Sequence, residues 1–325
     1  MRESIFSFWQ DPDFNALEDK PPAAGEDGLR PDPGRAGEES WVFEAFTTRP
    51  YHLRVSFTLS TSAAGTASLL RICWYGDGGT VHETWPGPEA APSAGAGNGG
   101  LSAGPNRVHF ESGKYLLRLE TDNIAGELEW EPLVPGWQPG AGRLAFGDQG
   151  RLQLFWRVPV PRAAVRGRIT IDGKDYALEG LGYHDYRRYN FPLGQALAGI
   201  CLGRFYHDQY TLLFADFGGN LLYSGKHVAA LYLVGEKGTL ISTPHVETNP
   251  AGQSSSPPKE VRAAAHPPVY LVLDPPLNLW QEELKGGLAA GSLRMWLASG
   301  RLRLATDPER EVRVWGRVEN LTVTG

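Results

Sequence analysis

The feature that most constrains the fold is a long series of short, strand-like runs separated by turn residues. In Leu53–Leu59 apolar and polar residues alternate, which is typical of a strand with one face in the core and one in water. With 40 Gly and 25 Pro in 325 residues, the chain has the turn residues that many short strands need. The sequence therefore predicts an all-β fold, a sandwich or a barrel, with helix limited to a short segment at 278–285. The other strand-like runs cover residues 41–46, 67–75, 107–110, 115–121, 126–130, 152–158, 166–171, 176–178, 200–206, 210–216, 229–233, 269–273, 292–297, 302–305 and 312–318.

Interruptions in the series of strand-like runs predict the domain organisation. Residues 1–38 contain a stretch rich in Asp, Glu, Pro and Gly without apolar periodicity, so we expect an extended lead-in. A Pro/Gly-rich bridge at 132–150 predicts a boundary between two β-domains, 39–145 and 146–325. The stretch 86–106, rich in Gly, Ala, Pro and Ser, predicts a long loop, either a flexible insertion or a lid over a barrel opening.

Composition excludes several classes of partner. The net charge is −6 and the pI about 5.8, and there is no basic stripe with interleaved aromatic residues, so we expect no nucleic-acid binding. No Cys/His cluster has zinc spacing, and Cys73 and Cys201 are expected to be two buried thiols rather than a disulfide. There is no signal-peptide core and no apolar run of ~20 residues. We therefore expect a soluble, cytoplasmic protein without membrane insertion.

Chemically active side chains are concentrated in the segment Gly182–Pro192. It holds a histidine, an aspartate, two arginines and three tyrosines directly after a strand-like run. Ionisable and aromatic groups at this density are costly to bury unless they pair with each other or meet a ligand. We therefore expect this segment to line the functional site.

Several segments resemble the hydroxyneurosporene synthase (carotenoid 1,2-hydratase) family, in the family's order. They are Glu39–Ala45, Trp156–Ala163 with Gly167, Gly180–Pro192, Gly203-Arg204 and Thr211–Asp216. The resemblance covers about residues 39–235. It implies two tandem lipocalin-like β-barrels with a ligand pocket in or between them, and an apolar, often polyene, ligand. Related folds include Diels–Alderases of polyketide pathways, so the resemblance does not imply one reaction.

The resemblance also shows where this chain departs from the hydratases. The second motif histidine and the tryptophan that are catalytic in the hydratases are Tyr186 and Arg188 here, and the motif's asparagine and following glycine are Arg187 and Tyr189. On the later strand, the catalytic Tyr-x-Asp pair of the hydratases is Phe214 with Asp216. Of the four catalytic groups that the family implies, only the aspartate is present. Since hydration of an isolated alkene needs a strong acid and a base for water, these replacements argue against it.

Each candidate residue also has a purely structural interpretation. His184 and Asp185 form either an oriented acid/base pair or, as we favour, buried hydrogen bonds that tie the strand to its neighbours. Arg187 and Arg188 either hold a planar oxyanion or form ion pairs with carboxylates of the protein. Since neighbouring strand residues point to opposite faces, one of the two arginines is expected in the pocket, and Arg188 is our choice.

The same ambiguity applies to Asp216 and to the aromatic side chains. Asp216 acts either as an acid/base or as a hydrogen-bond acceptor for Tyr186 or Arg188. The aromatic residues line a substrate pocket or, as is commoner at strand spacing, belong to the core. The candidate substrate-binding residues are Trp41, Phe43, Trp74, Trp156, Tyr183, Arg187, Tyr189 and Phe214.

The functional hypothesis is a cofactor-independent, metal-independent cyclase of secondary metabolism that acts on an extended apolar polyene. A Diels–Alder-like reaction moves no obligatory proton, so catalysis would come from holding the polyene in a reactive conformation. Arg188 or Tyr186 would polarise a conjugated carbonyl. The first alternative is hydration or isomerisation of a carotenoid or terpenoid alkene with Asp216 as the acid. The second is a non-catalytic carrier of a lipid or pigment.

Overall fold

The computed structural model describes residues 22, 37–47, 51–62, 65–76, 79–87, 100–248, 257–285, 288–304 and 311–323. The greater part of the lead-in expected at 1–38, and of the loop expected at 86–106, lies outside these residues. Within them the structure is built from β-strands and three short 3-10 turns, so the expected all-β fold is confirmed. The 3-10 turns are η1 (Asp148–Gly150), η2 (Leu193–Gln195) and η3 (Leu221–Tyr223).

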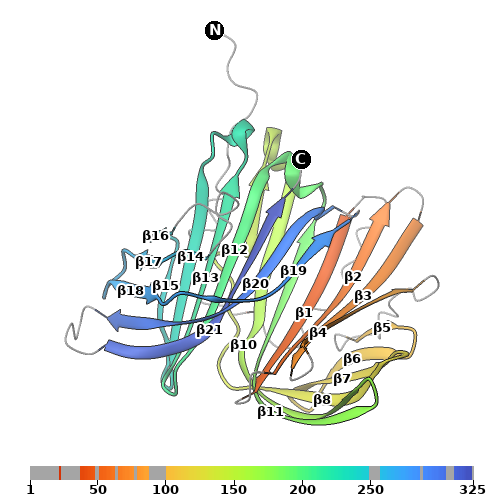
Figure 1. Ribbon diagram of the computed structural model, residues 1–325. Helices are drawn as coiled ribbons and strands as arrows, with labels where there is room; N and C mark the ends of the chain where they lie inside the picture. Colours follow the sequence, from red (N-terminus) through yellow and green to blue (C-terminus); the bar gives the residue numbers. More distant parts are fainter. Residues whose placement is uncertain are drawn as a thin grey trace. The chain divides into compact units, whose positions relative to one another are not determined.

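One sheet contains eleven strands among the described residues. They are β1 (Gly37–Thr47), β2 (His52–Ser62), β3 (Gly65–Gly76), β4 (Gly79–Gly87), β5 (Leu101–Ala103), β6 (Asn106–Glu111), β7 (Lys114–Glu120), β8 (Ile124–Pro132), β9 (Arg143–Phe146), β10 (Leu152–Ile171) and β11 (Lys174–Tyr189). The strand order is β4-β3-β2-β1-β11-β10-β8-β7-β6-β5, with β9 paired to β10. Figure 1 shows β1 beside β11, although the two strands are far apart in the sequence.

The second sheet contains ten strands among the described residues. They are β12 (Leu197–Tyr206), β13 (Tyr210–Gly219), β14 (His227–Gly235), β15 (Gly238–Thr243), β16 (Val246–Glu247), β17 (Glu260–Ala263), β18 (Val269–Leu273), β19 (Leu277–Leu284), β20 (Gly291–Leu304) and β21 (Glu311–Val323). The strand order is β15-β14-β13-β12-β21-β20-β18-β17-β16, with β19 paired to β20.

The chain forms two compact units. Among the described residues, one contains 139–154 together with those from 191 onward, and the other contains those from 22 to 138 together with 155–190. This grouping differs from the expected division into 39–145 and 146–325 over 139–145 and over 155–190, where β11 returns to pair with β1. Each unit has its own apolar core. That of the first sheet includes Trp41, Phe43 and Trp130, and that of the second includes Phe205, Phe214 and Trp296.

Local turn chemistry explains the hairpin between β10 and β11. Its connection is Asp172-Gly173, with φ of 50° and 77° respectively. A two-residue type I′ hairpin needs positive φ at both positions, and Asp-Gly is a preferred pair for that conformation. The hairpin brings the segment with the densest chemical groups back along the sheet as β11.

The expectation of a short helix at 278–285 is wrong. Residues Leu277–Leu284 form β19, which pairs antiparallel with β20 and has a register shift between Asn278 and Trp280. The local sequence includes good helix formers such as Gln281 and Glu282. Backbone hydrogen bonds to β20 and burial of Trp280, which is 5% exposed, override that weak local preference.

Both cysteines are buried free thiols, as expected. Cys73 lies on β3 and Cys201 on β12. Burial, together with the nearby carboxylates Asp216 and Glu319, raises the pKa of the Cys201 thiol well above its ordinary value. Cys201 is therefore a neutral packing residue at physiological pH and not a thiolate nucleophile.

Candidate functional site

The pairing of β1 with β11 organises the candidate residues of the first sheet. In the register, Trp41 lies opposite Tyr186, Phe43 opposite His184 and Glu39 opposite Arg188. Because side chains alternate along a strand, residues 184, 186 and 188 share the face of the sheet that carries the core. Residues 183, 185, 187 and 189 point to the opposite face. One continuous motif therefore supplies two separate clusters.

His184 is a fully buried residue that ties β11 to β1. Its Nδ1 lies 3.0 Å from the carbonyl oxygen of Val42, so Nδ1 carries the proton and donates to it. The ring stacks on Phe43 with centroids 3.9 Å apart and meets the edge of Tyr115 at 4.8 Å. These contacts support the structural interpretation of His184.

A glycine in the motif makes room for this packing. A Cβ atom at Gly182 would lie 2.5 Å from Nε1 of Trp130, closer than real side-chain contacts. That Nε1 donates a 3.0 Å hydrogen bond to the carbonyl oxygen of Glu44. Gly182 therefore allows the indole to lie against β11 and to connect it with β1.

Tyr186 and Arg188 follow His184 on the core-facing side of β11. The Tyr186 hydroxyl donates to Oε2 of Glu39 at 2.9 Å, and its ring lies 5.3 Å from that of Trp41. Burial first, and then the charge and hydrogen bond of Glu39, raise the pKa of Tyr186 well above its ordinary value. The hydroxyl is therefore protonated at neutral pH and already engaged as a donor. Arg188 is half-buried, and its guanidinium lies 5.8 Å from the centroid of the Phe155 ring.

Asp185 is the centre of the cluster on the opposite face. It is fully buried and accepts hydrogen bonds from Tyr183 Oη at 2.9 Å and from Trp156 Nε1 at 3.3 Å. Arg187 donates two further hydrogen bonds to Asp185, from Nε at 3.2 Å and from Nη2 at 2.9 Å, so the two side chains also form an ion pair. Trp156 also meets Trp137 edge-on at 5.2 Å. The cluster thus binds a buried carboxylate with donors from β10 and β11.

Tyr189, at the end of β11, is held in the same way by a carboxylate of β1. Its hydroxyl donates a short hydrogen bond to Oε1 of Glu38, while Ser60 donates to Oε2 of Glu38 at 3.2 Å. Burial and the nearby Glu38 charge raise the pKa of Tyr189 well above its ordinary value. Tyr189 is therefore a neutral donor that links β11 to β1.

Trp74, the remaining aromatic candidate of the first sheet, lies on β3. It is 2% exposed and packs against Tyr51 at 5.4 Å and Tyr176 at 4.9 Å. Trp41, Phe43 and Trp74 all belong to the apolar core of this sheet. Their placement favours the core interpretation over a lining role.

Asp216 and Phe214 lie on β13 in the second sheet, where Phe214 is fully buried in the core. Asp216 is 2% exposed, and its Oδ1 lies 2.7 Å from Nδ1 of His227 on β14. Its Oδ2 accepts a short hydrogen bond from the Thr248 hydroxyl. Tyr186, one of the two donors considered for Asp216, donates to Glu39 instead.

His227 is a functional candidate that sequence reasoning missed. Its side chain is 27% exposed, and among the described residues its Nε2 has no hydrogen-bond partner. The hydrogen bond to Asp216 raises the pKa of His227 above its ordinary value, with burial opposing. A carboxylate that orients an imidazole whose other nitrogen is accessible is an arrangement suited to general acid–base chemistry. No local signal indicates this pair, because it depends on the register between β13 and β14.

We expect Asp216→Asn to lower the pKa of His227, because the substitution removes the charge that stabilises the imidazolium. In the wild type, the raised pKa of His227 stabilises the folded state. This contribution is complete at pH values below the unfolded-state pKa of about 6.5, and it is lost as pH rises through the higher folded-state pKa. A pH titration of the His227 ring by NMR measures the shift. Glu236→Gln, at an exposed carboxylate beyond the end of β14, should leave it unchanged. An unaltered His227 pKa in Asp216→Asn would contradict the assigned pair.

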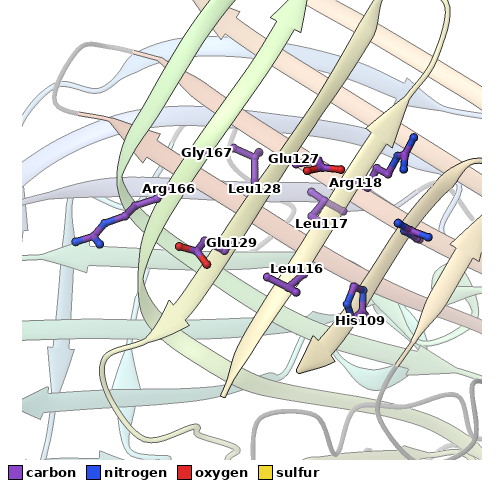
Figure 2. Close-up of a pocket in the computed structure, with 10 residues that line it drawn as sticks. His109, Leu116, Leu117, Arg118, Glu127, Leu128, Glu129, Arg166 and Gly167 are labelled. Carbon is purple, nitrogen blue, oxygen red and sulfur yellow. The ribbon is translucent and has the colours of Figure 1, made fainter. Parts of the chain in front are cut away.

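A pocket of about 440 Å³ lies on the side of the first sheet that faces away from the core. It is lined by residues of β6, β7 and β8 and by Arg166 and Gly167 of β10 (Figure 2). Gly167 has φ of +149°, and a Cβ there would lie 2.2 Å from the backbone oxygen of Glu127. Only glycine permits β10 to approach β8 so closely at this point. None of the residues proposed from the sequence lines this pocket.

Two further observations concern metals and membranes. Among the described residues, no three His, Cys, Asp or Glu side chains are grouped so that they could hold a metal ion. In the same part of the chain, no helix has the length and apolar character needed to cross a membrane.

Comparisons with known proteins identify the fold. Neither a protein-family model nor a curated protein sequence matches this chain. Several solved structures match over nearly the whole chain. CghA with Sch210972 has a TM-score of 0.65 at 14% identity, covering 98% of this chain and 99% of that one. A protein designated ATTH from Nitrosomonas europaea has a TM-score of 0.64 at 16% identity, covering 95% and 98%. Kievitone hydratase from Nectria haematococca has a TM-score of 0.62 at 14% identity, covering 95% and 96%.

At these identities the likeness establishes a common fold. The fold implied by the sequence resemblance, two tandem lipocalin-like β-domains, is confirmed. The similar structures have the fold that the resemblance to the carotenoid 1,2-hydratase family implies.

Proposed function

We propose that this chain is a cytoplasmic enzyme of secondary metabolism that binds an extended apolar polyene and cyclises it without a cofactor. The observation that carries the proposal is the core-facing side of β1 and β11. There the half-buried guanidinium of Arg188 lies at the end of an aromatic row formed by Phe43, Trp41 and Tyr186. Tyr186, whose raised pKa keeps it neutral, donates to Glu39, and Glu39 lies opposite Arg188 in the register, so the row of buried aromatic side chains ends in one guanidinium and one carboxylate.

The chemistry needs a folded polyene and a polarised carbonyl. Holding the reacting carbons close together supplies the orientation term, which accounts for several kcal/mol in well-ordered intramolecular reactions, about 7–11 at most. Arg188 donates to the oxygen of a conjugated carbonyl, and the Phe155 ring under the guanidinium helps to orient it. Two new carbon–carbon bonds form from π electrons of the same molecule, so atoms and protons balance without a co-reactant.

The proteins of the same fold support a small-molecule ligand. CghA was solved with the small molecule Sch210972, and kievitone hydratase is a hydratase by name. We extend only the broad class, a reaction on a small molecule, from these proteins to this chain. The choice between reactions comes from the residues of this chain.

Hydration or isomerisation of an alkene is the second candidate, and the Asp216–His227 pair favours it. The raised pKa of His227 keeps more of the imidazolium at neutral pH, and Asp216 fixes the orientation of the ring. Protonation of an alkene carbon from Nε2, followed by addition of water, returns one proton to His227 and adds one water to the substrate. A carrier without turnover is the third candidate.

The mass of the product and its number of double bonds together distinguish the candidates, because isomerisation changes neither, hydration adds one water, and cyclisation keeps the mass and removes double bonds. We expect the wild-type chain, mixed with a large excess of a conjugated polyene carbonyl compound, to give many equivalents of a product with unchanged mass and fewer double bonds. Mass spectrometry and ultraviolet absorbance measure both properties. A product heavier by one water would show that the reaction is hydration and not cyclisation. Binding at one equivalent with no product would identify a carrier.

A further inference from the structure

The outward-facing pocket of the first sheet is lined by two rows of mainly polar residues across neighbouring strands, and one of these rows contains Arg107, Arg118 and Glu127. Strand register places His109, Leu116, Glu129 and Arg166 in the other row, running from β6 through β7 and β8 to β10. In Figure 2, His109 and Arg166 lie on opposite sides of Leu116. Three strand spacings of ~4.8 Å give this row a length of roughly 14 Å. The pocket therefore suits an elongated small ligand.

The charges in the pocket are partly neutralised within the protein. Lys114 Nζ lies 3.3 Å from Oε2 of Glu129, and Arg118 Nη2 lies 2.9 Å from Oε2 of Glu120. Within the described part of the chain, the side chains of Arg107 and Arg166 make no ion pair and no hydrogen bond. These two guanidinium groups are exposed at the pocket and are available to an anion.

The middle of the pocket is apolar. Its apolar side chain on the outward face is Leu116, which is half-buried between charged side chains; Leu117 and Leu128 also line the pocket, but their side chains belong to the core on the opposite face. A volume of about 440 Å³ lies within the range of small-molecule sites. Among the described residues, the pocket therefore combines Leu116 with two unpaired guanidinium groups, Arg107 and Arg166, against one unpaired carboxylate, Glu127, and this excess of positive charge beside an apolar side chain suits a molecule with an apolar body and an acidic end.

We propose that this pocket is a second binding site, for a small carboxylic acid with an apolar body. The carboxylate pairs with Arg166 or Arg107 through two parallel N–H···O bonds, and the apolar body lies over Leu116. The site is separate from the side chains assigned to the reaction, because β10 and β8 present it on the face opposite to their core residues. The proposal does not depend on which reaction the protein performs.

Isothermal titration calorimetry with decanoate tests the site on the full chain. We expect one decanoate to bind and decanol, which lacks the charge, to bind at least tenfold more weakly. At least one of the variants Arg166→Ala and Arg107→Ala should weaken decanoate binding about tenfold or more, the usual effect of losing a charged hydrogen bond, and that variant identifies the arginine that pairs with the carboxylate. Arg301→Ala is the control, because Arg301 is exposed on β20 of the other sheet and does not line the pocket. It should bind decanoate like the wild type.

The competing results are distinct. Absence of decanoate binding, or equal binding of decanol, would overturn the site. If decanoate binds equally well to Arg166→Ala and Arg107→Ala, the ligand lies elsewhere and the proposal is wrong. Leu116→Glu gives a second measurement, since a carboxylate on the pocket floor should repel decanoate. Circular dichroism on each variant confirms that these surface changes leave the fold intact.

Discussion

Replacing Arg188 with alanine is expected to lower turnover of the polyene by on the order of 10²-fold or more. In the proposed cyclisation, negative charge grows on the carbonyl oxygen in the transition state, and Arg188 is the charged donor that faces it. The guanidinium is half-buried beside Phe155, where an electrostatic contact is stronger than in water. The loss should therefore fall mainly on kcat, measured at saturating substrate by product formation.

Two companion variants make this result decisive. Arg188→Lys keeps the charge but loses the planar donor geometry, so we expect an intermediate rate. Asp216→Asn should cost much less than Arg188→Ala, because cyclisation requires no proton transfer. Hydration predicts the reverse order, with Asp216→Asn nearly inactive because His227 loses its carboxylate. If Arg188→Ala retains turnover while Asp216→Asn abolishes it, cyclisation is the wrong reaction.

Replacing Asp185 with alanine is expected to lower the free energy of unfolding by about 3–5 kcal/mol. The carboxylate is fully buried and accepts hydrogen bonds from Tyr183, Trp156 and Arg187. Alanine removes this acceptor and leaves the Arg187 charge, whose side chain is 15% exposed, without its ion pair. Denaturant unfolding followed by tryptophan fluorescence measures the change.

A second aspartate on the same strand provides the control. Asp175 is exposed and accepts a 2.6 Å hydrogen bond from Thr170 at the surface, so Asp175→Ala should change stability by about 0.5 kcal/mol or less. Asp185→Asn keeps the shape and part of the hydrogen bonding, and we expect a smaller loss than with alanine. A loss below about 1 kcal/mol in Asp185→Ala would show that the cluster is not the structural support assigned to it.

Sequence reasoning worked best where the signal was local. Alternation of apolar and polar residues identified the β-class, because a strand with one buried face imposes a period of two on neighbouring residues. The Asp172-Gly173 turn was equally readable, since its two positive φ values match the residues present. The same period of two predicted that Arg187 and Arg188 point to opposite faces of the strand. In the structure Arg187 lies in the Asp185 cluster, on the face opposite to Arg188. The segment 278–285 shows the limit: its own preference for helix was too weak to oppose pairing with β20.

The tertiary structure decided the partners of each reactive group. Tyr186 donates to Glu39, 147 residues away, because β1 pairs with β11 in one register. Asp216 meets His227 through the register of β13 and β14, and Thr248 through the return of the chain at β16. The outward pocket needs four strands and the close approach that Gly167 permits. The sequence by itself determined the fold class and the position of the segment densest in ionisable and aromatic side chains, because both depend on neighbouring residues. Only the structure determined the pairs, because strand register is set by the whole sheet at once.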